Sequence, residues 1–131
     1  MIKIEQLLPE IDYKSSENRA IVRFNAEGTE ALIYYYWETW HPCAYVKVNK
    51  WDDDFEGYNV PCHWWITFSE KITDDTKWNK WRFTNGYRIW WDYAHGWDYM
   101  KILWSWKQWT TEEIMEDVID VITWCKEQWY I

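Results

Sequence analysis

The sequence is poor in glycine, proline and cysteine, and it contains no long apolar run. Its 131 residues include 4 Gly, 3 Pro and 3 Cys. So few Gly and Pro argue against a linker, a collagen-like repeat or a Gly-rich low-complexity segment. The longest apolar stretch, 31–37, is far shorter than the roughly 20 residues that a membrane-spanning helix needs. The length suits a single domain, 1–131, with one core.

Basic residues are also in the minority. The chain has 14 Lys and Arg against 22 Asp and Glu, a formal net charge of −8. Such a surface repels phosphate backbones, which excludes double-stranded nucleic acid held by counterion release. The three cysteines are odd in number and widely spaced, so we expect reduced thiols and a cytoplasmic protein. The first residues lack a signal-like apolar run, and we expect no association with a membrane.

Tryptophan is abundant where glycine is scarce. The chain contains 15 Trp, and aromatic residues make up 22% of it. This composition is the opposite of the low hydrophobicity that keeps chains disordered, so it predicts a folded domain.

Apolar and aromatic segments separated by turn residues predict an antiparallel sheet. Segments 19–26 and 31–38 are expected to form a hairpin, and Pro42 is expected to interrupt the chain before the next strand. Asn85-Gly86 predicts a tight hairpin between two later strands. The expected extended segments are 19–26, 31–38, 43–50, 60–70, 80–84 and 87–92.

The C-terminal segment has the pattern of a helix. Thr110 and Glu113 fit a capping box, in which the two residues satisfy each other's backbone amides. Ile114, Val118 and Ile122 recur at helical spacing, which predicts a helix of about 17 residues lying across the sheet. The predicted fold class is therefore α+β, an antiparallel β-sheet meander packed with one C-terminal α-helix.

Two motifs resemble a small family of phage and prophage proteins. They are CHWWITFS at 62–69 and IWWDYAHGWDY at 89–99. Family members carry V-x-H-G-G-[IL]-T-[FY]-S, then G-F-D-x-x-H-x-G-D-Y, with a Cys-x-Tyr-Val strand upstream and one helix downstream. The resemblance spans about 33–125 and implies a fold and a site rather than an activity. The matching residues are CAYV (43–46), His63, Thr67, Ser69, Asp92, His95, Asp98 and Tyr99.

Tryptophan occupies the glycine positions of this family pattern. These positions are Trp64, Trp65, Trp90 and Trp97, whereas Trp91 replaces another aromatic residue. We hypothesise that the four codons are UGA, which some genomes read as Gly and others as Trp. Glycine at these positions would then raise the melting temperature, because Gly adopts backbone conformations that strain other residues. The alternative is that the tryptophans are genuine and form an aromatic core or stacking surface.

The last tryptophan stands in a similar context. The chain ends in CKEQWYI, and glycine just past a helix is an ordinary C-terminal stop. We therefore extend the glycine hypothesis to this residue.

Histidines and aspartates of the motifs form the candidate site. Imidazole and carboxylate groups suit general acid–base catalysis, and they are also metal ligands. No cofactor is firmly implied, although a divalent metal is compatible with these residue types. A structural role is the alternative, since Asp and His often stabilise turns. The candidate catalytic residues are His63, Asp92, His95 and Asp98, and the candidate ligand-binding residues are Thr67, Ser69 and Tyr99.

Three functions are compatible with these features. The first is a small cytosolic accessory protein of a phage or mobile element, which binds a small polar ligand such as a nucleotide, or a host protein, through loops around His63 and His95. The second is a small metal-dependent or acid–base hydrolase that uses His63, Asp92, His95 and Asp98. The third is a structural or protein-interaction module with its aromatic surface as the interface. The sequence leaves the oligomeric state open.

Overall fold

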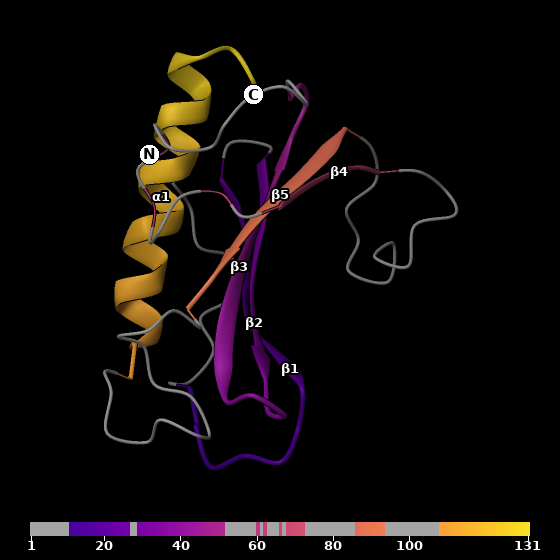
Figure 1. Ribbon diagram of the computed structural model, residues 1–131. Coiled ribbons are helices and arrows are strands. Elements are labelled where there is room, and N and C mark those ends of the chain that lie inside the picture. The colour runs from indigo at the N-terminus through magenta and orange to yellow at the C-terminus, as the bar shows by residue number, and fades with distance from the viewer. Residues whose placement is uncertain are drawn as a thin grey trace.

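A computed structural model gives the fold (Figure 1). It describes residues 11–26, 29–51, 60, 62, 66, 68–72, 86–93 and 108–131. These contain the strands β1 (Arg19–Ala26), β2 (Thr29–Tyr36), β3 (His41–Val48), β4 (Phe68–Lys71) and β5 (Tyr87–Asp92), and the helix α1 (Thr111–Glu127). All neighbouring strands are antiparallel, and α1 packs on the sheet. The predicted α+β class is confirmed.

The strand order in the sheet is β1-β2-β3-β5-β4. The first three strands follow one another as a meander. The last two do not, because β5 lies between β3 and β4. Strand β5 therefore has a neighbour on each side.

Pro42 does not interrupt the sheet as the sequence predicted. It is the second residue of β3 and lies opposite Tyr35 of β2. Its carbonyl oxygen accepts a hydrogen bond from the backbone amide of Tyr93 at 3.0 Å. Proline is tolerated near the start of a strand, where its missing N–H removes little from the ladder.

The prediction of a tight hairpin at Asn85-Gly86 is wrong. Tyr87, the first residue of β5, is paired with Val48 on one side and Lys71 on the other. Strand β5 thus pairs with β3 along one edge and with β4 along the other. The expected partner, 80–84, lies outside the described residues. Gly86 is needed for another reason. Its φ is +92°, and a Cβ there would overlap the carbonyl oxygen of Val48.

The extended segment predicted at 60–70 is shorter than expected. Within it, β4 begins at Phe68 and runs on to Lys71. Val60 and Ile66 are buried but belong to no strand, and the residues between them are described only at Cys62.

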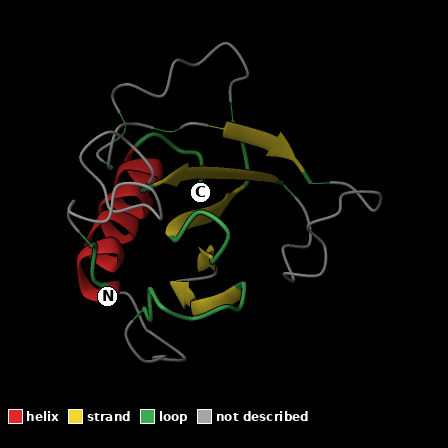
Figure 2. Ribbon diagram, turned by 60° about the horizontal axis from the view of Figure 1, so that its bottom comes forward, coloured by secondary structure: helices red, strands yellow, loops and turns green. Residues whose placement is uncertain are grey.

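Both faces of the sheet carry buried apolar side chains, and successive residues of each strand point to opposite faces. One face packs against α1, as Figure 2 shows, and here Val46 and Trp91 meet Val118 and Ile122 of the helix in one core. The opposite face carries a smaller cluster that comprises Leu32, Cys43, Tyr45 and Ile72. Within the described ranges, no helix is long and apolar enough to cross a membrane.

A chain of hydrogen bonds ties β5 to the helix. The indole N–H of fully buried Trp91 donates to the Tyr93 hydroxyl at 3.1 Å, and this hydroxyl donates to Asp117 Oδ2 at 2.7 Å. Burial and the Asp117 charge raise the pKa of Tyr93, so the hydroxyl stays protonated and able to donate. Trp91 is therefore both a packing residue and a hydrogen-bond donor.

The helix begins as predicted. Thr110 Oγ1 accepts from the Glu113 amide at 3.2 Å, and Glu113 Oε1 accepts from the Thr110 amide at 3.1 Å. This completes the capping box.

Replacing Thr110 by Ala removes the helix cap and is expected to cost about 1 kcal/mol of unfolding free energy. Urea unfolding at neutral pH measures this change. The matched control is Thr123→Ala, since Thr123 is exposed on α1 and its hydroxyl donates back to Ile119 O within the helix. This control should leave stability unchanged or raise it. Equal losses in the two variants would contradict the cap's role.

Candidate functional site

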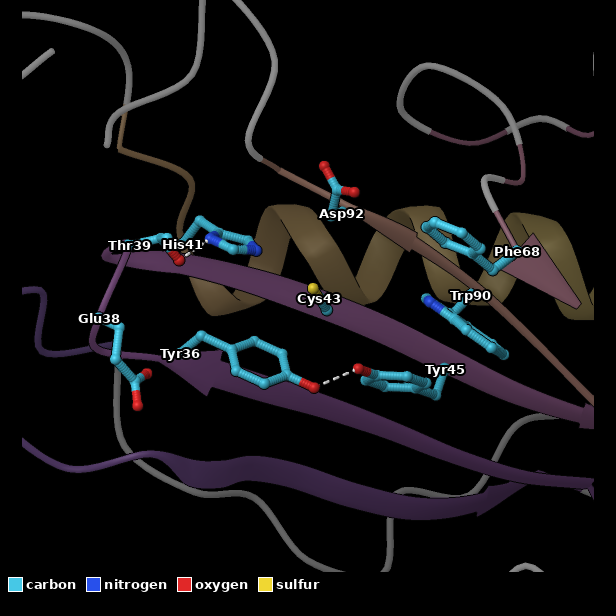
Figure 3. A pocket seen from close by; sticks show the side chains of 9 residues that line it. All are labelled: Tyr36, Glu38, Thr39, His41, Cys43, Tyr45, Phe68, Trp90 and Asp92. Carbon is cyan, nitrogen blue, oxygen red and sulfur yellow. Dashed lines mark hydrogen bonds between the residues drawn. The ribbon is translucent and has the colours of Figure 1, made fainter. Parts of the chain in front are cut away.

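A pocket lies on the sheet face opposite α1 (Figure 3). Its volume is about 410 Å³, within the range of roughly 300–1,000 Å³ usual for small-molecule sites. Side chains of β2, β3, β4, β5 and the turn between β2 and β3 line it. The lining residues are Tyr36, Glu38, Thr39, His41, Cys43, Tyr45, Phe68, Trp90 and Asp92.

Strand register brings these side chains together. Cys43 lies opposite Asp92 and Tyr45 opposite Trp90, because β3 and β5 are direct neighbours. Alternate residues of a strand share a face, so both pairs project to the same side. The pocket floor is therefore made by two strands whose facing residues here lie more than forty positions apart in the chain.

Aromatic rings form the wall at the β4 end. Phe68 stacks on Trp90 with ring centroids 5.3 Å apart and an interplanar angle of 20°. The ring centroids of Trp90 and Tyr45 are 5.8 Å apart. The side chain of Phe68 is 55% exposed, so this wall reaches solvent. It offers flat apolar surface to a ring-shaped ligand.

Two tyrosine hydroxyls meet in the pocket. The hydroxyl oxygens of Tyr36 and Tyr45 are 2.6 Å apart, joined by a hydrogen bond. Burial raises the pKa of Tyr36 to about 12 and that of Tyr45 further still. Both hydroxyls are therefore protonated at neutral pH. The hydrogen of one hydroxyl forms the bond between them, and the hydrogen of the other hydroxyl points away from this bond.

The turn between β2 and β3 supplies the remaining polar groups. Thr39 Oγ1 and His41 Nδ1 are hydrogen-bonded, and the imidazole stacks on Tyr36 at 5.6 Å. Glu38 Oε1 accepts a hydrogen bond from the side-chain Nδ2 of Asn18 at 3.0 Å. The histidine and this carboxylate are thus held at the rim by neighbouring side chains.

Two carboxylate side chains line the pocket. They are Glu38 and Asp92, with His41 as a third titratable group, and among the described residues neither Lys nor Arg lines it. Arg88 lies close by but is turned to other partners. It is buried, it forms an ion pair with Glu70, and its guanidinium carbon is 4.7 Å from the Trp90 ring centroid. This arrangement favours a ligand of positive charge.

Cys43 is not an activated nucleophile. Burial raises the pKa of its thiol well above the ordinary value, and the charge of Asp92 raises it further. The thiolate is the reactive form of cysteine, so this raised pKa disfavours a nucleophilic role for Cys43 at neutral pH.

Of the predicted site residues, the structure describes Asp92 and Ser69. Asp92 lines the pocket, while Ser69 is exposed on β4 opposite Ile89 and is not a lining residue. The grouping of Asp92 with the motif histidines stays a prediction. His63, Thr67, His95, Asp98 and Tyr99 lie outside the described residues, as do Trp64, Trp65 and Trp97.

Sequence reasoning missed the third histidine and the tyrosines around it. His41 and Tyr36 are in no motif and lie opposite one another in the hairpin formed by β2 and β3. Tyr45 falls in the CAYV match and lies on the same face of β3 as His41. The available signal was the alternation of side-chain direction along each strand of this hairpin, which puts these side chains on the face of the sheet away from α1. In the part of the chain that is described, no group of three or more His, Cys, Asp or Glu side chains is placed to hold a metal ion.

No family model, curated protein or solved structure matches this chain. The function must therefore be argued from the pocket.

Replacing Asp92 by Asn is expected to lower the pKa of Cys43, because a nearby negative charge that disfavours the thiolate is removed. The alkylation rate of the Cys43 peptide by iodoacetamide, followed by mass spectrometry between pH 7 and pH 11, measures this shift. Its midpoint should move to lower pH. Asp120→Asn, at an exposed position of α1, is the control and should not move it. An unchanged midpoint in Asp92→Asn would show that the two groups are not coupled.

Proposed function

We propose that this protein binds a small ligand that carries both a planar ring and a positively charged amine. The observation behind the proposal is the pocket itself, in which an aromatic wall adjoins two carboxylates. This ligand differs from the small polar ligand predicted from the sequence, which was expected at loops around His63 and His95, because those two residues lie outside the described residues and the pocket is lined by others.

The aromatic wall suits the ring of such a ligand. Phe68, Trp90 and Tyr45 present flat surfaces, and aromatic contacts are worth ~0.5–1.5 kcal/mol each beyond the area they bury. The Arg88 guanidinium already lies over the Trp90 ring, so the wall serves the ring of the ligand and the amine needs another partner.

The carboxylates suit the amine. Glu38 and Asp92 would each attract an ammonium group, whereas the phosphate of a nucleotide would be repelled by both. The proposal therefore favours an amine over a nucleotide.

The binding proposal rests on described residues. The hydrolase stays an alternative prediction, because His63, His95 and Asp98 lie outside the described residues and Asp92 is the one described member of that group. The resemblance of the motifs to phage and prophage proteins supports placing the binding protein in a phage or mobile element, acting in the cytoplasm as an accessory protein. A host protein is a further partner compatible with the exposed aromatic wall.

Two probes of matched shape test the charge preference. Phenethylamine and 3-phenylpropionate both carry a phenyl ring on a short chain, but with opposite charges. Isothermal titration calorimetry at pH 7 should show the amine binding at least about tenfold more tightly, a difference of ~1.4 kcal/mol. Adenosine monophosphate is the third probe. Tighter binding of the phosphate compound than of the amine would overturn the charge preference, and binding of none of the three would overturn the proposed ligand class.

Carboxylate variants locate the binding of the amine. Glu38→Gln and Asp92→Asn should each weaken phenethylamine binding about three- to tenfold, because each removes an attraction and keeps the side-chain shape. The control is again Asp120→Asn, on the helix side of the sheet, which should bind as the parent protein does. Parent-like binding by both pocket variants would show that the amine binds elsewhere.

A further inference from the structure

Two tryptophans have a left-handed backbone. Among the described residues, the non-glycine positions with positive φ are Trp40, at 54°, and Trp129, at 65°. In this conformation the Cβ of an L-residue crowds the following carbonyl oxygen, while glycine has no Cβ to crowd it. A bulky residue here is an outlier that calls for an explanation.

Trp129 occupies the glycine position of a helix C-terminus. The Tyr130 amide donates to Cys125 O at 2.9 Å, and the Trp129 amide donates to Lys126 O at 3.1 Å. This pair of bonds defines the Schellman motif, whose left-handed residue is usually glycine. The Trp129 side chain is 84% exposed, so its ring gains little burial to offset the strained backbone.

Trp40 occupies a comparable position in the turn between β2 and β3. Tyr36 and His41 close the hairpin, and the Trp40 amide donates to Trp37 O at 3.2 Å. Short hairpin loops of this kind favour glycine where the chain is left-handed. The conformation of residue 40 also sets the direction of Thr39 and His41, its neighbours in the chain, both of which line the pocket.

Other tryptophans have ordinary backbones. Trp91 lies in the middle of β5, fully buried, and donates a hydrogen bond to Tyr93. Trp90 is also a strand residue and does not have a positive φ, so the backbone reason for glycine does not apply there. The left-handed positions are therefore distinct from the packing positions.

We infer that residues 40 and 129 are glycine in the natural protein, encoded by UGA codons that are rendered here as tryptophan. Trp91, by contrast, is a tryptophan encoded by UGG. The inference rests on backbone conformation at two positions outside the motifs, and it goes beyond the ligand proposed for the pocket.

The nucleotide sequence of the gene is the first test. We expect UGA at codons 40 and 129 and UGG at codon 91. UGG at codon 40 or 129 would overturn the inference. UGA at codon 91 would also overturn it, because UGA codons would then occur at tryptophans with and without a left-handed backbone.

Paired variants of the chain as printed test the physical reason. Trp129→Gly and Trp129→Ala both remove the indole, but only the glycine variant removes the Cβ. The folded-to-unfolded ratio of the glycine variant, from urea unfolding, should exceed that of the alanine variant about 5- to 30-fold. Trp40→Gly and Trp40→Ala should differ in the same direction. Equal ratios within both pairs would overturn the conformational argument.

Trp91→Gly is the matched control for a tryptophan of the packing kind. It should lose more than about a hundredfold in the folded-to-unfolded ratio, because it empties a buried site and removes a hydrogen bond. A stability gain in this variant would contradict the distinction between the two kinds of tryptophan.

Discussion

The pairing of β3 with β5 is the constraint on which the rest of this structure depends. Strand β3 is central and buried on both faces, so its register decides which side chains meet the helix and which meet the pocket. With Cys43 opposite Asp92, Ala44 and Val46 face α1 while Cys43 and Tyr45 face the pocket. A shift of one residue would exchange the two sets. Core and site are thus specified together, by a single ladder.

Most of the fold could be predicted from local patterns. Alternation predicted the first three strands, and the Thr110–Glu113 pair predicted where the helix starts. Local patterns failed where a distant partner decides the outcome. Gly86 was read as part of a tight turn, whereas the nearby carbonyl oxygen of Val48 explains why it must be glycine. The insertion of β5 between β3 and β4 is likewise a choice between partners far apart in the chain, and no short motif encodes it.

The site was less accessible to sequence reasoning. Asp92 could be predicted because it lies in a motif, but His41, Tyr36 and Tyr45 become neighbours of it only through the register of three strands. Their chemistry also depends on burial, which composition does not reveal. Cys43 is an example, since burial and the charge of Asp92 raise the pKa of its thiol, and neither effect can be seen from its place in the sequence. Residue types near one another in the chain therefore say little about the pocket's chemistry.

The paired hydroxyls of Tyr36 and Tyr45 give the pocket an adjustable contact. Their hydrogen bond can run in either direction, since either oxygen can be the donor. Reversing it exchanges which of the two hydroxyls donates to the other, without moving a heavy atom or changing a charge. For the ligand proposed above, selectivity would then come from the carboxylates and the ring stack, with the hydroxyl pair able to rearrange its hydrogens between related compounds.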